Sequence, residues 1–375
     1  MDALKKILAV VMSLILGVYG LLGLTAGTGE EYTEGKYKNV ILLIGDGMGD
    51  NTIAATEALK DVELSIKNMP VYLHSDIDSF IIPATDSAAG GTALATGTRV
   101  WINSLAVYPF DPFSIEDINV PITLCELAKA NGKAAGVVTT DETSGATPSS
   151  FSSHTYERGD EKGISADQLI SGFDLIWGGA SDSINKENTA SNGWTYIDDR
   201  DEMNALEAGS RSFGQFSYSD LKNVTDNHNT PTVSEMTEKA IELLDENENG
   251  FFLMVEGACI DKFAHDNKMD GVTLSTVEFD KAVAAALEFA EKDGETLVVV
   301  TADHATGGIV YNEKNESFEF THGTHDTYDV PVYVSATDAG FKSGEEINNR
   351  QISVQISIVM GFGEEQFPAS SVSAK

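Results

Sequence analysis

The chain has 375 residues and a formal net charge of −35, from 59 acidic and 24 basic side chains. So strong a negative charge excludes a protein that binds nucleic acid or anionic membranes through a general basic surface. The length is sufficient for one large α/β domain with insertions, and the two cysteines are too few for a disulfide framework.

The first segment of the chain is typical of an export signal. Two lysines precede an apolar run over residues 7–24, and small residues follow it up to Ala26. We expect a signal peptide over residues 1–26, and therefore a protein exported to the periplasm, the cell surface or the medium. The run is also long enough to span a bilayer, so an uncleaved membrane anchor is the alternative.

The first predicted strand is residues 40–44, a continuous apolar run of the kind that is buried on both faces of a sheet. The run leads directly to Asp46. In open α/β sheets, ligands bind outside the carboxyl ends of the strands. We therefore expect Asp46 to face a site at this edge.

The segment from Asp86 to Gly97 places Ser87 between an acid and a run of very small, helix-compatible residues. A helix that begins here directs its unpaired N–H groups and the positive end of its dipole toward the serine. Small neighbours also allow a bulky anion to approach the backbone. Taken alone, the segment is equally well explained as a capped helix rich in alanine and glycine. With an activator nearby, Ser87 is a candidate nucleophile.

Residues 181–230 are polar and rich in asparagine, serine and aspartate. We expect them to form a small variable insertion near the site. After the signal segment, the rest of the chain is predicted to be a single domain over residues 37–375.

Two later apolar runs repeat the pattern of the first strand and also end in candidate metal ligands. The runs with the residues that follow them are 251–255 with Glu256, Asp261, Lys262 and His265, and 296–300 with Asp303 and His304. Strands of this kind predict an α/β fold, with a central, mostly parallel sheet flanked by helices on both faces. Three strands that deliver acids or imidazoles to one edge indicate a metal site there.

The chain resembles the alkaline phosphatase family in six segments that occur in the family's order. They are ILLIGDGMG, TDSAAGGTALATG, ATPSSFSSHTYERG, FFLMVEGACIDKFAH, VVVTADHATGG and GTHDTYDVPVY. The resemblance implies the family's α/β fold and hydrolysis of small-molecule phosphate monoesters through a phosphoserine. It also implies two zinc ions, one magnesium ion and a possible homodimer.

The resemblance assigns a role to each matching position. Ser87 matches the nucleophile, Arg158 the arginine that holds two phosphate oxygens, and Lys262 a lysine near the phosphate. The implied metal ligands are Asp261, His265 and His325 for the first zinc, Asp46, Asp303 and His304 for the second zinc, and Asp46, Thr147 and Glu256 for magnesium. Imidazoles with carboxylates suit zinc, an all-oxygen set suits magnesium, and a guanidinium fits phosphate in a bidentate manner.

Two positions need separate consideration within this resemblance: one offers a choice between two histidines, and the other departs from the family's pattern. His322 lies three residues before His325, and His325 is preferred because it keeps the family's spacing to the following strand. The family commonly has an aspartate or a histidine two residues before its magnesium-binding Thr or Ser, where this chain has Gly145. We therefore expect a weak third metal site, no counter-charge for Lys262 from this position, and tighter magnesium binding in a Gly145→Asp variant.

Two other readings of the site residues stay open. A phosphodiesterase, or another metal-dependent phosphoryl-transfer enzyme of the same superfamily, would use a similar pair of metals. An acidic cell-surface metal-binding protein would need the ligands but neither Ser87 nor Arg158. The sequence around Ser87 lacks the Cys/Ser-x-Pro-x-Arg setting of a sulfatase.

Overall fold

The computed structural model describes residues 35–80, 85–111, 114–223, 229–362 and 372–373. The predicted signal peptide, residues 1–26, lies outside these ranges. Within them, every helix is too short or too polar to cross a membrane.

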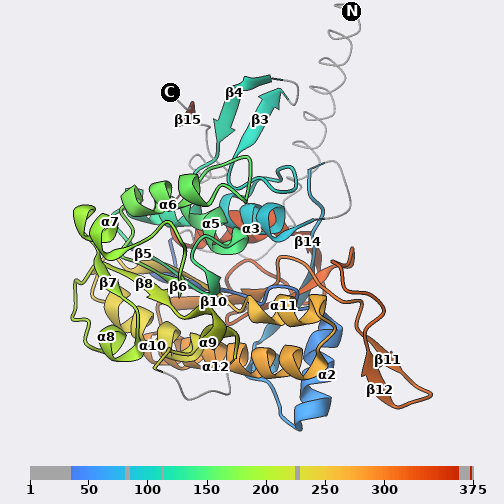
Figure 1. Cartoon of the computed structure of the whole chain (residues 1–375). Coiled ribbons are helices and arrows are strands. Elements are labelled where there is room, and N and C mark those ends of the chain that lie inside the picture. Colours follow the sequence, from blue (N-terminus) through green and yellow to red (C-terminus); the bar gives the residue numbers. More distant parts are fainter. Residues whose placement is uncertain (1–34, 81–84, 112–113, 224–228, 363–371, 374–375) are drawn as a thin grey trace, which may run out of the picture. The chain divides into compact units, whose positions relative to one another are not determined.

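A ten-stranded sheet forms the centre of the described chain (Figure 1). Its order is β14 (Glu346–Asn348), β2 (Val71–Asp76), β13 (Val330–Val334), β10 (Thr296–Thr301), β1 (Asn39–Ile44), β9 (Phe251–Glu256), β5 (Ala134–Glu142), β6 (Leu175–Gly179), β8 (Ser212–Phe216) and β7 (Thr195–Ile197). β13 is antiparallel to both of its neighbours, and the other recorded pairings are parallel. The predicted mostly parallel α/β sheet is confirmed, and the three apolar runs are its adjacent strands β10, β1 and β9.

Helices cover both faces of this sheet, because successive side chains of a strand point to opposite sides. In β1, Ile41 and Leu43 belong to one apolar cluster with α10 (Val233–Leu244) and α12 (Met269–Asp293). Val40 and Leu42 belong to another with α4 (Leu124–Ala130) and α13 (Asn349–Val359). Figure 1 shows α3 and α5 on one side of the sheet and α10 and α12 on the other. The continuous apolar sequence of the central strands is thereby explained, since both faces of the strands are buried.

The helices have the following bounds: α2 (Asp50–Lys60), α3 (Ser87–Thr96), α4 (Leu124–Ala130), α5 (Ala146–Ser152), α6 (Glu161–Ile170), α7 (Lys186–Ser191), α8 (Arg200–Asn204), α9 (Tyr218–Lys222), α10 (Val233–Leu244), α11 (Cys259–His265), α12 (Met269–Asp293), α13 (Asn349–Val359) and the short 3₁₀ helix η1 (Ser65–Asn68). The smaller sheets are β11 (Val310–Asn312) with β12 (Ser317–Glu319), and β3 (Tyr108–Asp111) with β4 (Ser114–Val120) and β15 (Val372–Ser373).

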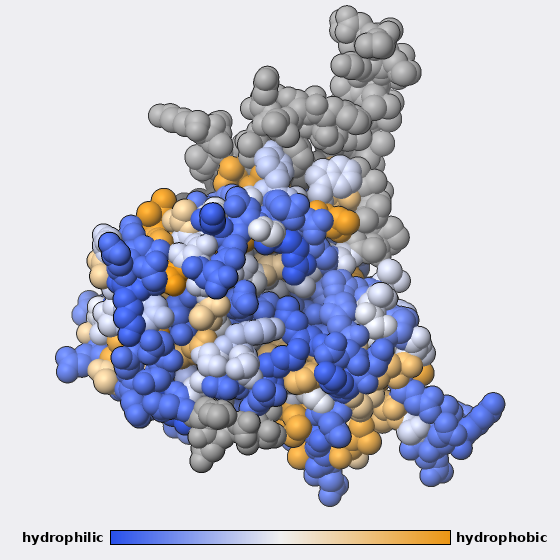
Figure 2. Space-filling view, in the orientation of Figure 1, coloured by the Kyte–Doolittle hydropathy of each residue, from blue (hydrophilic) through white to orange (hydrophobic). Residues whose placement is uncertain are grey.

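The polar segment 181–230 contributes to the edge of the central sheet in its described part. It contains α7, β7, α8, β8 and α9, and β8 pairs in parallel with both β6 and β7. That this segment is a variable insertion stays a prediction. In the space-filling view the exposed face is predominantly hydrophilic, in keeping with the acidic composition (Figure 2).

Candidate functional site

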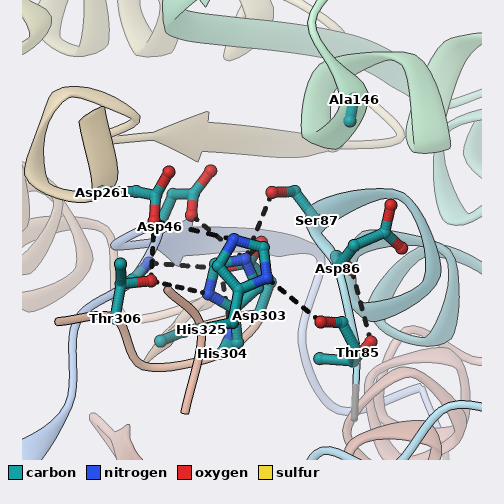
Figure 3. A network of polar contacts seen from close by, with 12 residues as sticks. Asp46, Thr85, Asp86, Ser87, Ala146, Asp261, Asp303, His304, Thr306 and His325 are labelled. Atoms are coloured by element: carbon teal, nitrogen blue, oxygen red, sulfur yellow. Dashed lines mark hydrogen bonds and ion pairs between the residues drawn. The ribbon is translucent and has the colours of Figure 1, made fainter. Parts of the chain in front are cut away.

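The site lies at the carboxyl ends of three adjacent strands. β1 pairs in parallel with β9 and β10, so that Ile44 lies opposite Glu256 on one side and Thr301 on the other. The residues that follow β1 and β10, Asp46 and Asp303, therefore reach the same edge (Figure 3). This is the position that open parallel sheets use for ligands.

One group of candidate metal ligands consists of Asp261, His265 and His325, whose donor atoms all lie within 4.8 Å of one another. The helical spacing in α11 puts the first two on one face, with His265 Nε2 3.3 Å from Asp261 Oδ2. His265 Nε2 also lies 3.1 Å from Nε2 of His325. The imidazole of His325 is held in place by two contacts. His325 forms a β-bridge with Thr306, and its Nδ1 lies 3.1 Å from the Thr85 carbonyl oxygen.

A second group consists of Asp46, Asp303 and His304, and all three residues are buried. His304 Nε2 lies 3.6 Å from Asp46 Oδ1 and 3.4 Å from Asp303 Oδ2. The His304 ring stacks on that of His325, with centroids 3.7 Å apart, and this contact joins the two groups. Oxygen and nitrogen donors in such groups match the ligand types of zinc.

Burial raises the pKa of the carboxyl groups in the second group. The pKa of Asp46 lies well above its ordinary value because of burial and the charges of Asp303 and Asp261. Burial and the Asp261 charge raise the pKa of Asp303 to about 7. Several carboxylates that face one another away from water are costly unless a cation neutralises them. The electrostatics therefore favour bound cations.

The histidines and Asp261 differ in their charge states. Burial lowers the pKa of His304, and burial with the charge of His304 lowers that of His325, so both favour the neutral imidazole that binds metals. The hydrogen bond with Asp261 raises the pKa of His265. Burial alone would raise the pKa of Asp261, but the hydrogen bond from His265 holds it below its ordinary value.

Ser87 is the first residue of α3, as the sequence predicts, and Asp86 caps the helix by accepting a hydrogen bond of 3.0 Å from the Ala89 N–H group. The Ser87 Oγ atom lies 3.2 Å from His304 Nε2, so the hydroxyl faces the second ligand group (Figure 3). The start of the helix adds N–H groups and a positive dipole end on the same side. An anion that approached Ser87 would meet favourable charge from the helix and from any bound cation.

Arg158 approaches Ser87 from a different segment of the chain. Its Nη1 donates a hydrogen bond of 3.1 Å to Asp86 Oδ2, and its backbone N–H donates one of 2.9 Å to the Asn103 carbonyl oxygen. The guanidinium is thus fixed beside the nucleophile candidate, with further N–H groups available for a phosphate.

Three oxygen atoms fit the expected magnesium ligands. Asp46 Oδ1, Thr147 Oγ1 and Glu256 Oε1 are buried and have no hydrogen-bond partner among the described residues. Burial and the Asp141 charge raise the pKa of Glu256 to about 8. Buried polar atoms are normally satisfied, so orphaned oxygens indicate an atom that binds there. Asp303 Oδ2, in the second group, is orphaned in the same way.

Lys262 receives no counter-charge from position 145, but it has one from another residue. Lys262 Nζ lies 3.0 Å from Asp141 Oδ2, and Asp141 comes from the end of β5. A Cβ atom at Gly145 would stand 2.5 Å from the same Asp141 oxygen, so a Gly145→Asp variant would require Asp141 to move, and its effect on magnesium binding stays a prediction. The counter-charge that Gly145 cannot supply to Lys262 is therefore supplied by Asp141.

Other residues of the site were missed by the sequence analysis. Thr306 Oγ1 donates a hydrogen bond of 2.6 Å to Asp261 Oδ1 and lies 3.2 Å from His304 Nδ1. Its hydroxyl orients a residue of each ligand group, but a lone threonine carries no sequence signal for this. Asp141 did carry a sequence signal, because it follows the apolar start of a fourth buried strand, β5. His322, the rival of His325, instead pairs with Asp326 at 3.1 Å, outside both ligand groups.

The comparisons with known proteins agree with this architecture. Residues 37–190 and 178–355 match the family model for alkaline phosphatase. The chain is 34% identical over 320 residues to alkaline phosphatase 3 of Bacillus subtilis, across 77% of this chain and 67% of that protein. It is 32% identical over 349 residues to the alkaline phosphatase of Escherichia coli K12, across 75% and 73% of the two chains.

Solved structures give the same result. The alkaline phosphatase of the Antarctic bacterium TAB5 is 28% identical, with a TM-score of 0.74 over 88% of this chain and 100% of that chain. The fold is also that of Thermus thermophilus alkaline phosphatase, which is 18% identical with a TM-score of 0.79 over 93% and 97% of the chains. A variant of the TAB5 enzyme carries magnesium in its M3 site.

The fold and these matches define an α/β protein of the phosphatase and phosphoryl-transfer class. Within that class, the chain belongs to the alkaline phosphatase family.

Proposed function

We propose that the protein hydrolyses phosphate monoesters to an alcohol and inorganic phosphate, with a phosphoserine intermediate on Ser87. The observation that carries the proposal is the place of Ser87 at the start of α3, with its Oγ atom 3.2 Å from a histidine of one ligand group. Membership of the alkaline phosphatase family supports the same reaction.

The residues that would hold the cofactors are the three sets described above. Asp261, His265 and His325 would bind one zinc, and Asp46, Asp303 and His304 the other. The orphaned oxygens of Asp46, Thr147 and Glu256 would bind magnesium, the hard cation that prefers oxygen ligands. When bound, such cations supply positive charge for the entering and leaving oxygens of an in-line displacement.

The chain's own residues carry the remaining steps. Ser87 gives up its hydroxyl proton to solvent, and its Oγ atom bonds to phosphorus as the ester P–O bond breaks and the alcohol leaves with a proton from water. Water then attacks phosphorus, the Oγ–P bond breaks, and inorganic phosphate and the free serine hydroxyl are formed. Arg158, which Asp86 holds in position, binds two non-bridging oxygens through its fork of N–H groups.

Monoesters are favoured over diesters because Arg158 and the proposed cations would act together on one phosphate group. A monoester dianion carries more charge to neutralise than a diester, and Arg158 adds to the charge of the proposed metals. An acidic cell-surface metal-binding protein would need neither the helix-capped serine nor an arginine fixed beside it. The net charge of −35 repels phosphate esters in general, so the attraction must come from these local groups.

The proposal is tested by the hydrolysis of a chromogenic phosphate monoester and of the matching diester, each with and without a chelator. We expect monoester hydrolysis that the chelator abolishes and that zinc with magnesium restores. Faster hydrolysis of the diester would favour the phosphodiesterase alternative. Metal binding without hydrolysis of either ester would favour the metal-binding protein. Export and a homodimer stay predictions, which cell fractionation and the molar mass in solution would test.

A further inference from the structure

A bulge in β5 changes the direction of the chain next to the site. β5 pairs in register with β6 from Gly136 to Val138, which lies opposite Trp177, and the next pair is Glu142 with Gly179, so β5 carries extra residues between these last two pairs. Bulges of this kind redirect a side chain near functional sites. Asp141 lies inside this bulge. Small residues on β6 accommodate it, because a Cβ atom at Gly178 would lie 2.9 Å from the Asp141 carbonyl oxygen.

The redirected Asp141 side chain contacts Lys262 across the site. Its Oδ2 lies 3.0 Å from Lys262 Nζ, and the two side chains are 12% and 27% exposed. The Asp141 N–H group donates a hydrogen bond of 2.8 Å to Thr139 Oγ1, and that hydroxyl donates to Glu256 Oε2. The ion pair is therefore connected to one of the proposed magnesium ligands by two hydrogen bonds.

Gly145 is required by space and not by its backbone. Its φ of −56° and ψ of 158° are open to any residue, and its N–H group donates an ordinary hydrogen bond of 2.8 Å to the Glu142 carbonyl oxygen. A Cβ atom there would instead stand 2.5 Å from Asp141 Oδ2 and 2.8 Å from its Cγ. It would also stand 2.9 Å from the Glu142 carbonyl oxygen, so the Asp141 carboxyl group takes up most, but not all, of the volume that a side chain at 145 would need.

We propose that Asp141 is a positioning residue, whose carboxylate holds the Lys262 ammonium group at the phosphate position and excludes any side chain from position 145. The assignment rests on the proposed function of the site and on the expectation, from the family resemblance, that Lys262 lies near the phosphate. A lysine side chain has four rotatable bonds and loses much freedom when its tip is fixed. Asp141 fixes it before the ligand arrives.

The electrostatics of the pair agree with this role. The Asp141 carboxylate and the Lys262 ammonium group carry opposite charges and lie 3.0 Å apart in a largely buried setting. Without Asp141, the lysine would remain near other acids of the site and could turn toward them.

The first test uses inorganic phosphate and the zinc- and magnesium-loaded protein with Ser87→Ala, in which binding is measured without turnover. Adding Asp141→Asn keeps the side-chain shape and removes its charge. We expect phosphate binding to weaken about tenfold, from the loss of one preorganised charged contact. In the protein with Ser87, the same substitution should raise KM and the inhibition constant of phosphate more than it lowers kcat.

A matched control lies at the opposite end of β5. Lys129 Nζ lies 2.7 Å from Asp174 Oδ2, in a pair whose side chains are 28% and 36% exposed. Asp174 N–H donates to the Ala135 carbonyl oxygen, at the start of the strand. Asp174→Asn should lower the thermal stability but leave phosphate binding unchanged. If the Asp141→Asn variant binds phosphate as tightly as the protein with Asp141 intact, the positioning role is overturned.

The second test substitutes Gly145 and Asp141 in combination and asks whether their side chains compete for the same volume. Gly145→Ala should lower the melting temperature clearly when Asp141 is present, and less in an Asp141→Gly background, where only the contact with the Glu142 carbonyl oxygen remains. In that background, Gly145→Asp should restore part of the phosphate affinity, whereas Gly145→Ala should not. An equal cost of Gly145→Ala in both backgrounds would overturn the spatial half of the proposal.

A failure of the proposed function and a failure of the positioning role give different experimental results. If the proposed phosphatase function is wrong, the protein with Asp141 intact will neither hydrolyse monoesters nor bind phosphate. The stability comparison at position 145 then still decides whether the two residues share one volume. If the function is right and only the positioning role is wrong, hydrolysis and phosphate binding will be normal and insensitive to Asp141→Asn.

Discussion

Arg158 Nη1 donates a hydrogen bond of 3.1 Å to Asp86 Oδ2, and Asp86 is also the residue that caps α3. One carboxylate therefore orients the helix that begins with Ser87 and the guanidinium beside it. Asp86 Oδ2 accepts a further hydrogen bond of 3.1 Å from the Asn103 N–H group, which ties a third segment to the same point.

The two roles of Asp86 can be separated. Asp86→Asn keeps a good helix cap but places an amide where Arg158 needs a carboxylate. We expect a melting temperature near that of the parent protein and a higher inhibition constant for phosphate. Asp86→Ala should also lose about 1 kcal/mol of stability, the usual cost of a lost cap. If both variants bind phosphate as the parent does, Asp86 does not position Arg158.

Ser87→Ala removes the proposed nucleophile without disturbing the cap on Asp86. Monoester turnover should fall by at least about a thousandfold, while the zinc content and the melting temperature stay close to those of the parent. Acid quenching of the parent enzyme with labelled phosphate should leave label on the peptide that contains Ser87. Label on any other peptide would contradict the covalent mechanism.

His325 and His322 should respond differently to substitution. His325→Ala removes a nitrogen donor from the group of Asp261 and His265, so zinc stoichiometry and activity should fall together and excess zinc should restore part of the activity. His322→Ala breaks a pair with Asp326 outside the ligand groups and should keep the full zinc content. Metal analysis that ranks the two variants in the opposite order would reverse the ligand assignment.

Removal of the metals should make stability fall as the pH rises. The pKa of Asp303 lies at about 7 and that of Glu256 at about 8, above their ordinary values of 3.8 and 4.5. Groups with a raised pKa in the folded state stabilise it at low pH, and that contribution is lost as the pH rises through the raised pKa. Above the ordinary histidine pKa of 6.5, His304 and His325 are neutral in both states and no longer oppose this trend.

The measurement is the melting temperature of the chelated protein between about pH 6.5 and pH 8, a window bounded by the ordinary pKa of histidine and the raised pKa of Glu256. It should decrease across this window. With zinc and magnesium present, the decrease should be much smaller, because cations stabilise the ionised carboxylates. A chelated protein that becomes more stable over the same range would show that these carboxyl groups are not held in the protonated form.

Much of the fold and of the candidate site was predictable from local sequence. The apolar runs gave the strands β1, β9 and β10, since only a strand buried on both faces needs an unbroken apolar sequence. The spacing of small residues after Asp86 gave α3 and its cap. Parallel pairing then places the residues after each strand at one edge, so the sequence already pointed to Asp46, Glu256 and Asp303 as neighbours.

The partners of the charged residues were decided by the tertiary structure. Asp86 and Arg158 lie far apart in the chain, and no local pattern links them before the loops pack against each other. Asp141 reaches Lys262 because a bulge shifts the register of β5 against β6, and strand register is a property of the pair of strands. The amino-acid sequence by itself determined which residue types stand at the ends of the strands and the helix. The packing of distant segments determined which of those side chains meet, because hydrogen bonds and ion pairs depend on distances that the order of residues does not contain.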